Sequence, residues 1–370
     1  MSFPGFGLEG VKGIGGGTIS KESEYNYRRA HELLKERKTK EAIPFLVKAI
    51  EDPNNLDACV ALSSTMPTPD AQIGFLTTSE AIGRTHLKRF LGPDCFELTS
   101  RQGAPNFWGI LATRPYMRLL SMLTRTYISS QRWQEAAATN IEILRLCESD
   151  NLGHQGWMGP LLLHAGRPVD ALYFARAWLE SGGPPRGSEV DFAPPNRAAM
   201  TPEELEDVTN PFMNLQTIYS AALAAFTVDG DSELARQYLH LAVSKFPAVL
   251  IKVLGKFKER VDVDTHATRT INGLEDARDH LWLAQGLWSQ PGPWDWISND
   301  PVVKDHVFRP CSDPSCKKKE ERIAQWQKCA GCKQDWYCSR ACQKAHWCDH
   351  KEECKQRQRL ANVDLTGLVW

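Results

Sequence analysis

Eight potential metal ligands stand in four short pairs within this 370-residue sequence, and they constrain its fold more than any other feature. In chain order, the pairs are Cys311 and Cys316, Cys329 and Cys332, Cys338 and Cys342, and His350 and Cys354. Zinc prefers four thiolate or imidazole donors in a tetrahedron, and two donors a few residues apart can come from one local turn. Four pairs therefore predict two closed sites of four ligands. A closed site has no position for water or substrate, so we expect two structural Zn²⁺ ions.

Disulfide bonds are the alternative explanation for clustered cysteines. Eight of the eleven cysteines lie between residues 311 and 354, while Cys59, Cys95 and Cys147 are scattered. The first twenty residues contain seven glycines and no apolar run, so we expect no secretory signal peptide. Thiols of cytosolic and nuclear proteins stay reduced. We therefore expect a cytoplasmic or nuclear protein whose clustered cysteines bind zinc and whose scattered cysteines are small core residues.

Spacing alone leaves two ways to distribute the eight ligands. In a sequential arrangement, the first two pairs bind one ion and the last two bind the other. In an interleaved arrangement, the first and third pairs share one ion, and the second and fourth pairs share the other. Gly331 lies in the second pair and allows a tight turn. Cys348 is surplus, and it competes poorly with His350 because it would not share a helix face with Cys354.

The end of this region resembles a MYND-type zinc finger. The residues that carry the resemblance follow a CxxC knuckle, and they are Tyr337, Cys338, Cys342, Gln343, Trp347, His350 and Cys354. The resemblance implies the interleaved arrangement. It assigns Cys311, Cys316, Cys338 and Cys342 to one zinc, and Cys329, Cys332, His350 and Cys354 to the other. The first pair departs from the family pattern because four residues separate its cysteines instead of two. That change lengthens a loop without removing a ligand.

The resemblance also implies a kind of partner. Members of this family bind short proline-containing peptides, and the contacts carried over to this sequence are Gln343 and Trp347. An indole on a metal-fixed helix presents a flat apolar surface that suits a pyrrolidine ring. The alternative is that Trp347 is the hydrophobic plug of a finger too small to have another core.

Charge argues against nucleic acid as the main partner. The formal net charge of the chain is −1, whereas nucleic-acid-binding domains are usually strongly basic. Between Cys311 and Leu360 there are 12 Lys and Arg against 7 Asp and Glu, and ligating thiolates reduce that surplus. We therefore expect protein partners, with no specific nucleic acid and no membrane.

Residues 20–300 show helical periodicity with few strand signals, and parts of them resemble tetratricopeptide (TPR) repeats. Such repeats place small and aromatic residues where two helices touch, with a period near 34 residues. Ala136 and Ala171 occupy equivalent positions 35 residues apart. An irregular all-helical domain is the alternative. Three units fit, and an earlier one is a residue short: Leu120, Leu123, Tyr127, Ala136 and Ile143; Gly159, Leu162, Ala171 and Trp178; Tyr219, Phe226, Ala235, Leu239, Ala242 and Pro247; and Leu33, Ala42, Leu46, Ala49 and Pro53.

These patterns predict a mainly α protein, in which a TPR-like helical array precedes a small two-zinc finger. The predicted parts are a flexible Gly-rich tail (1–19), the array (20–300) with an insertion loop (181–212), the finger (305–360) and a tail (361–370). Within the insertion, Thr201 and Glu204 predict a capped helix start. A helix break is expected at 290–293. The four indoles between Trp282 and Trp296 are expected to pack the end of the array against the finger.

Enzyme motifs are incomplete in this sequence. Gly5, Gly7 and Gly10 match GxGxxG without room for a preceding strand, and His31-Glu32 lacks the second histidine of HExxH. We therefore expect a non-catalytic interaction scaffold, with transcriptional co-regulation as a role suggested by the family alone. The alternatives are a relative of the SET-domain lysine methyltransferases and a finger that only caps the array.

Overall fold

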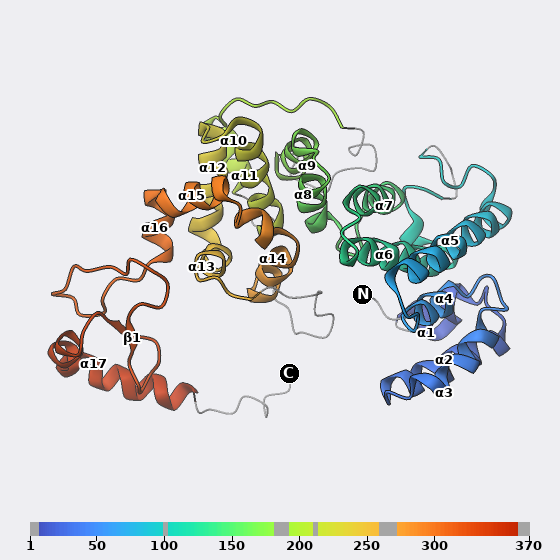
Figure 1. Cartoon of the computed structure of the whole chain (residues 1–370), viewed down its shortest axis with the longest axis horizontal. Coiled ribbons are helices and arrows are strands. Elements are labelled where there is room, and N and C mark those ends of the chain that lie inside the picture. The colour runs from blue at the N-terminus through green and yellow to red at the C-terminus, as the bar shows by residue number, and fades with distance from the viewer. Residues whose placement is uncertain (1–6, 99–102, 181–191, 210–213, 259–271, 362–370) are drawn as a thin grey trace.

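The structure, a computed structural model, describes residues 7–98, 103–180, 192–209, 214–258 and 272–361. Helices dominate it, and successive helices pack side by side into an arc with the zinc-ligand region at one end (Figure 1). The mainly α fold predicted from the sequence is therefore confirmed. In the part of the chain described, every helix is too short or too polar to span a membrane.

The elements follow one another along the arc in chain order. The N-terminal part contains α1 (Leu8–Lys12), η1 (Ile14–Gly16), α2 (Lys21–Lys35), α3 (Thr39–Ala49), α4 (Leu56–Ser63), α5 (Pro69–Leu91), η2 (Phe107–Gly109), η3 (Leu111–Thr113), α6 (Arg114–Ser129) and α7 (Trp133–Leu146). The middle contains α8 (Gln155–His164), α9 (Pro168–Glu180), α10 (Pro202–Val208), α11 (Leu215–Asp229), α12 (Glu233–Lys245) and α13 (Ala248–Leu254). The last part contains α14 (Leu274–Trp288), α15 (Pro291–Asn299), α16 (Pro301–Val307), β1 (Gln327–Lys328), β2 (Trp336–Tyr337) and α17 (Arg340–Ala361).

Four helix pairs coincide with the four predicted repeat units. Extensive contacts join α2 to α3, α6 to α7, α8 to α9 and α11 to α12. The alanines at the expected positions, Ala42, Ala136, Ala171 and Ala235, are completely buried. Small side chains at these positions allow two helix axes to approach closely. The pairing of helices thus follows the sequence pattern, while the identity of the pairs as tetratricopeptide repeats stays a prediction.

Residues 7–19 are ordered, which corrects the expectation of a flexible tail there. The buried Glu9 carboxylate accepts hydrogen bonds from Arg118 Nη1 at 2.9 Å and from the Gly15 amide at 2.9 Å. Arg118 also donates to Asp57 at 2.6 Å, so one guanidinium joins α1, α4 and α6. The side chain of Ile14 is buried beside α2 and α3. Residues 1–6 of the predicted tail lie outside the described residues.

The predicted helix start inside the insertion is confirmed. Thr201 Oγ1 accepts a hydrogen bond from the Glu204 amide, and Glu204 Oε2 accepts one from the Thr201 amide, which is a capping box. Arg176 of α9 donates to the carbonyl of Asn196 at 2.7 Å and holds the preceding segment on that helix. The rest of the predicted insertion lies outside the described residues, except for 192–209, as does the predicted tail beyond residue 361.

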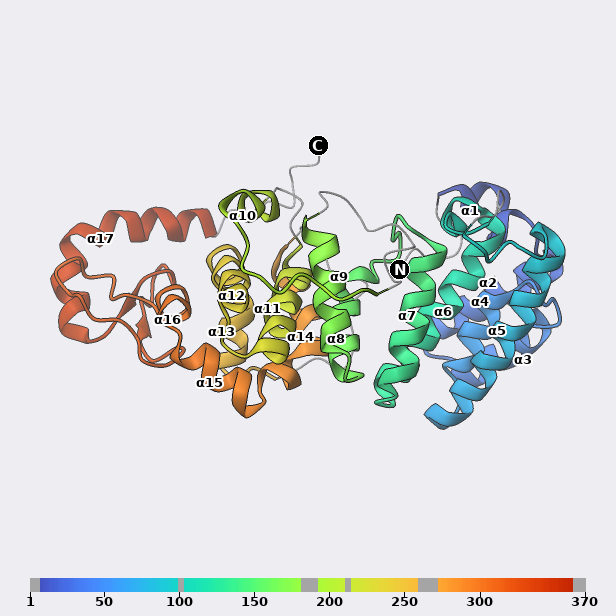
Figure 2. The same cartoon turned by 90° about the horizontal axis from the view of Figure 1, so that it is seen from above.

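The C-terminal tryptophans pack within the array instead of against the finger. Trp288 is completely buried, and Trp296 stacks on Phe226 of α11 with 4.4 Å between ring centroids. The expected break at 290–293 is confirmed, because α14 ends at Trp288 and α15 begins at Pro291. The array extends through α16, beyond the predicted boundary at 300, since two valines of that helix are buried in the same core. Helices α15 and α16 join the array to the finger (Figure 2).

Candidate metal centre

A short hairpin and one long helix position most of the ligands. Strands β1 and β2 pair antiparallel, with Gln327 opposite Tyr337. Cys329 and Cys338 directly follow the two strands, so the antiparallel pairing places these two cysteines at opposite ends of the hairpin. Helix α17 begins at Arg340 and carries three further ligands, Cys342, His350 and Cys354. The ligands therefore come from a loop, a hairpin and a helix that the metal would tie together.

The first ligand cluster contains Cys311, Cys316, Cys338 and Cys342, whose sulfurs all lie within 4.8 Å of one another. The Cys338 Sγ is 3.6 Å from both Cys316 Sγ and Cys342 Sγ. The Cys311 amide donates to the Lys318 carbonyl at 2.9 Å and closes the loop between the first two cysteines. The wide spacing of this pair is thus absorbed by the loop. Three of the four cysteines are only half-buried.

The second ligand cluster contains Cys329, Cys332, His350 and Cys354. Cys329 Sγ lies 3.8 Å from Cys354 Sγ, and Cys332 Sγ lies 3.5 Å from His350 Nε2. All four residues are buried, in contrast to the first cluster. Cys348 is exposed and belongs to neither cluster. His350, and not Cys348, is therefore the fourth ligand of the second cluster.

Both clusters fit tetrahedral zinc. A Zn–S distance near 2.3 Å places two sulfurs about 3.8 Å apart, and a sulfur and an imidazole nitrogen about 3.6 Å apart. The observed separations of 3.5 to 3.8 Å agree with these values. A disulfide would need sulfurs at about 2.0 Å, so the alternative of disulfide bonds is not seen in these clusters. When bound, Zn²⁺ supplies crosslinks with no open coordination position.

The interleaved arrangement is the one found in the structure. The first pair of ligands shares a cluster with the third pair, and the second shares a cluster with the fourth. Each zinc site therefore joins segments separated by the other site. The two sites therefore tie the same stretch of chain into one compact unit.

A carboxylate outside the ligand set supports the second site. Asp335 Oδ2 lies 3.5 Å from His350 Nδ1 and accepts a hydrogen bond from Arg357 Nη1 at 2.7 Å. At 3.5 Å the histidine contact is electrostatic and too long for a good hydrogen bond. A carboxylate beside the second imidazole nitrogen nevertheless favours the ring orientation that points Nε2 at a metal. Neither Asp335 nor Arg357 was predictable from the sequence, because no ligand spacing marks them.

Gly331 has a different role from the one expected. Its φ angle is not in the left-handed region, so the turn does not require glycine. A Cβ at this position would lie 2.8 Å from Cys354 Sγ and would clash with the side chain of Gln358. The glycine therefore permits α17 to approach the knuckle closely.

The surroundings of Cys329 favour the thiolate that a metal requires. Burial raises the pKa of this thiol, but hydrogen bonds from the backbone amides of Cys332 and Gly331 and from His350 outweigh it and lower the pKa to about 7. The thiolate is the form of cysteine that binds zinc.

Comparison with known proteins agrees with this geometry. The model of the MYND finger family matches residues 311–354, which include all eight ligands. Residues 311–354 form a MYND finger. The MYND-type zinc finger protein samB of Emericella nidulans is 44% identical over 47 residues. That match covers 13% of this chain and 8% of samB, so the chain spans less than a tenth of the relative it matches. No solved structure matches the chain.

The MYND finger has a small core of its own that excludes Trp347. Trp326 and Tyr337 are buried among the ligands, with 8% and 2% of their surfaces exposed. Trp347 is 42% exposed on α17, and its ring meets the ring of His350 edge-on with centroids 5.9 Å apart. Gln343 lies one turn earlier on the same face of the helix and is half-buried. Trp326 and Tyr337 therefore form the hydrophobic core of the finger, and Trp347 does not.

Proposed function

We propose that this protein is a non-catalytic scaffold whose MYND finger binds proline-containing peptides on Gln343 and Trp347. The observation that carries the proposal is the exposure of Trp347 beside a buried zinc ligand. A finger with its own plug has no structural need for a further aromatic ring on its surface. An aromatic ring on a metal-fixed helix loses little conformational entropy when it stacks on a proline.

The helical array is proposed to bind a second protein. Arrays of stacked helix pairs present extended surfaces, and here the array forms an arc with the finger at one end (Figure 1). Binding two segments of one partner or two partners together would raise the effective concentration of the second contact. Each cluster offers four protein ligands, so a bound zinc would have no open position for a substrate, which supports a role of the finger without catalysis at the metal. The free thiols of Cys59, Cys95 and Cys147 support a reducing, intracellular location.

A peptide array incubated with the full chain tests the finger's role. We expect micromolar binding to proline-anchored peptides, weakened about tenfold or more by Trp347→Ala and by Gln343→Ala. Glu352→Ala is the matched control, because this exposed residue lies on another face of α17. Zinc content should equal two per chain in every variant. Binding that survives Trp347→Ala would place the peptide elsewhere and remove the proposal.

A second candidate role is that the finger caps the end of the array. Phe308 and Ile323, which flank the first ligand loop, pack against the main core of the array. Removal of residues 308–360 would then lower the melting temperature of the remaining helices and promote their aggregation. An unchanged melting temperature would exclude capping and leave peptide binding as the finger's role.

A further inference from the structure

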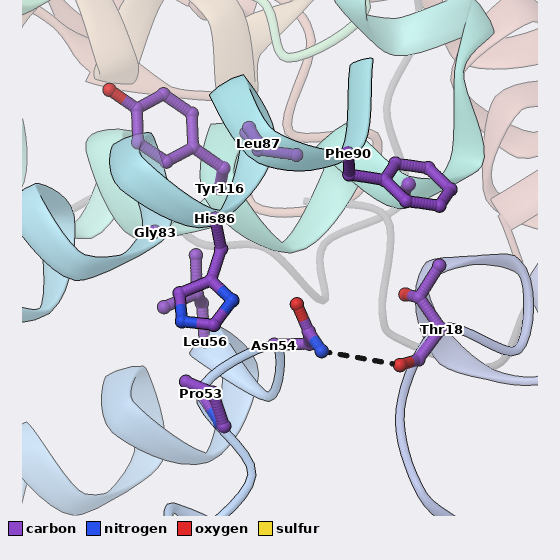
Figure 3. A pocket seen from close by; sticks show the side chains of 10 residues that line it. Thr18, Pro53, Asn54, Leu56, Gly83, His86, Leu87, Phe90 and Tyr116 are labelled. Atoms are coloured by element: carbon purple, nitrogen blue, oxygen red, sulfur yellow. Dashed lines mark hydrogen bonds between the residues drawn. The ribbon is translucent and has the colours of Figure 1, made fainter. Parts of the chain in front are cut away.

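A small cavity opens near the N-terminal end of the array, at the opposite end of the arc from the finger (Figures 1 and 3). Its volume is about 160 Å³, and its walls come from α4, α5, η3, α6 and the loops before α2 and α4. Sites for drug-sized ligands typically measure roughly 300 to 1,000 Å³. A cavity of roughly 150 Å³ accepts a benzene ring in an engineered protein. The size therefore suits one aromatic ring rather than a whole metabolite.

The floor of the cavity is apolar. Leu56 of α4, Leu87 of α5 and Tyr116 of α6 line it. Gly83 lets α5 approach closely, since a Cβ there would lie 2.6 Å from Leu56 Cδ1. The Tyr116 hydroxyl donates to Glu80 at 2.5 Å, so this ring presents carbon atoms to the cavity. An apolar floor of this kind gains free energy by burying a ring.

Two polar groups stand at the mouth of the cavity. His86 is half-buried, and its ring nitrogens have no hydrogen-bond partner among the described residues. Asn54 donates its amide to the Thr18 carbonyl at 3.4 Å, and its side-chain oxygen points towards α5 (Figure 3). These groups can accept a hydrogen bond from an indole N–H or a phenol O–H. They favour tryptophan or tyrosine over phenylalanine as the occupant.

An exposed aromatic residue extends the apolar wall to the surface. Phe90 lies on the last turn of α5 and is 64% exposed. Gly83, His86, Leu87 and Phe90 recur every three or four residues and so share one face of the helix. By the same spacing, the basic residues that follow Leu87 lie on other faces of α5. Phe90 and the floor of the cavity thus form one contiguous apolar surface that a partner's side chain can cover.

An acidic recess adjoins the cavity through the turn at residues 52–54. The recess measures about 300 Å³, and its charged lining residues are Glu22, Glu51, Asp52 and Lys48. Three carboxylates against one ammonium give it a negative balance. Asp52 accepts a hydrogen bond from the Ser20 amide at 2.7 Å, which ties the two segments that line the recess. This charge complements a basic segment next to the aromatic anchor.

We propose that the cavity binds one tryptophan or tyrosine side chain of a partner protein, with lysine or arginine next to it in the partner's sequence. The ring enters the apolar floor, its N–H or O–H meets His86 or Asn54, and the basic side chain lies in the acidic recess. This site deepens the proposed binding role of the array and rests on it. It makes no use of the finger.

Methyl NMR of the full chain tests this site with three blocked tripeptides. The probes are N-acetyl-Trp-Lys-Arg-amide and its counterparts with Ala in place of Trp, or with Glu-Glu in place of Lys-Arg. We expect saturable shifts of the Leu56 and Leu87 methyl signals with the first probe, and affinity about tenfold lower for each counterpart. Absence of saturable shifts at millimolar concentrations, or equal affinity for the Ala counterpart, would overturn the proposal. Equal affinity for the Glu-Glu counterpart would overturn the basic neighbour.

Variants separate this site from the rest of the molecule. Ala112→Leu fills the cavity and Phe90→Ala removes its rim, and both should weaken the first probe about tenfold or more. Ile82→Ala is the control, because Ile82 is also exposed on α5 but does not line the cavity. If Ala112→Leu unfolds the chain, the surface variant Phe90→Ala still tests whether the probe binds in the cavity. Trp347→Ala should bind the probe normally, so failure of the finger proposal and failure of this site give different results.

Discussion

The helical array and the MYND finger are stabilised in different ways. One continuous apolar core runs through the array from Leu56 to Val307, with a smaller core beside α2 and α3. The finger's buried cluster consists of four ligating cysteines and two aromatic residues. Apolar burial contributes about 25 cal/mol per Å², summed over many side chains. Structural zinc contributes on the order of 10 kcal/mol per site. The two regions should therefore fail under different conditions.

Zinc removal should have the largest effect and should be confined to the finger. Excess chelator is expected to release two zinc ions per chain and to unfold residues 311–361, because the finger has almost no apolar core. Hydrogen exchange followed by mass spectrometry should show lost protection there and unchanged protection in α2 to α9. Loss of protection throughout the array would show that the array depends on the finger for its stability, and would support the capping role.

Arg118→Met should destabilise the array and leave the finger intact. The substitution removes the cation from the buried Asp57 carboxylate and leaves Glu9 with only Arg114 at 4.0 Å, which costs about 3–5 kcal/mol. Urea unfolding monitored by helical circular dichroism measures the loss, and zinc content should stay at two. Arg132→Met is the control, since this exposed arginine pairs with exposed Glu135 and should cost much less stability than Arg118→Met. A similar small loss for Arg118→Met would show that the ordered N-terminal segment adds little.

Asp335→Asn should weaken one zinc site and leave the array unchanged. Loss of the carboxylate beside His350 is expected to lower zinc affinity about 10- to 100-fold at the second site. Competition with a chromogenic chelator should then show one weak and one normal site per chain. Glu353→Gln is the control, because it removes the other partner of Arg357 and leaves Asp335 in place. Equal affinities in the variant and the parent would remove Asp335 from the zinc site.

Acid should weaken the array through a buried histidine. Burial, together with the charge of Arg125, lowers the pKa of His154 to about 3. Its Nδ1 lies 2.6 Å from Asn140 Oδ1 and its Nε2 lies 2.8 Å from Ser121 Oγ, as suits a neutral ring. Below pH 6.5 the imidazole of His154 binds a proton in the unfolded chain but stays neutral in the folded chain. The contribution of the neutral His154 to the free energy of unfolding is complete above pH 6.5 and declines towards pH 3. At pH 5.5 the loss is about 1.4 kcal/mol.

A pH series of urea unfolding curves measures this effect. His154→Gln should be less stable at pH 7.5 and should lose less stability between pH 7.5 and pH 5.5 than the parent does. The exposed His306, changed to glutamine, is the control and should leave the pH dependence unchanged. Equal pH dependence in His154→Gln and the parent would show that this histidine does not set the acid response. The finger is the same in all three chains, so release of its zinc cancels in the comparison.

Different features were predictable from the sequence in the finger and in the array. All eight ligands were predictable because their spacing reflects turns only a few residues long. Helix pairs were predictable because buried alanines recur with the period of the pairs. Interleaving was not predictable from spacing, and the resemblance to MYND fingers supplied it. In each of these cases the signal is local or periodic.

Contacts without a local pattern were missed. Glu9 and Arg118 are 109 residues apart, so their ion pair leaves no pattern in the sequence. Without it, the glycines around residue 15 suggested a flexible tail. Asp335 and Arg357 are 22 residues apart and resemble ordinary surface charges in the sequence. The cavity beside Phe90 is built from four separate segments, and its size depends on how α5 lies over α4. Such features follow from tertiary packing alone.

Interleaved ligands have a consequence for synthesis on the ribosome. The first site requires Cys338 and Cys342, and the second requires His350 and Cys354, so neither can close when Cys316 or Cys332 emerges. At roughly 5–20 residues per second, the 43 residues that follow Cys311, up to and including Cys354, take about 2–9 seconds to make. During that interval at least one of the two sites lacks its full set of ligands. Oxidants and competing metal ions therefore have a short opportunity to act on the nascent finger, which ends when its last turn of helix leaves the ribosome.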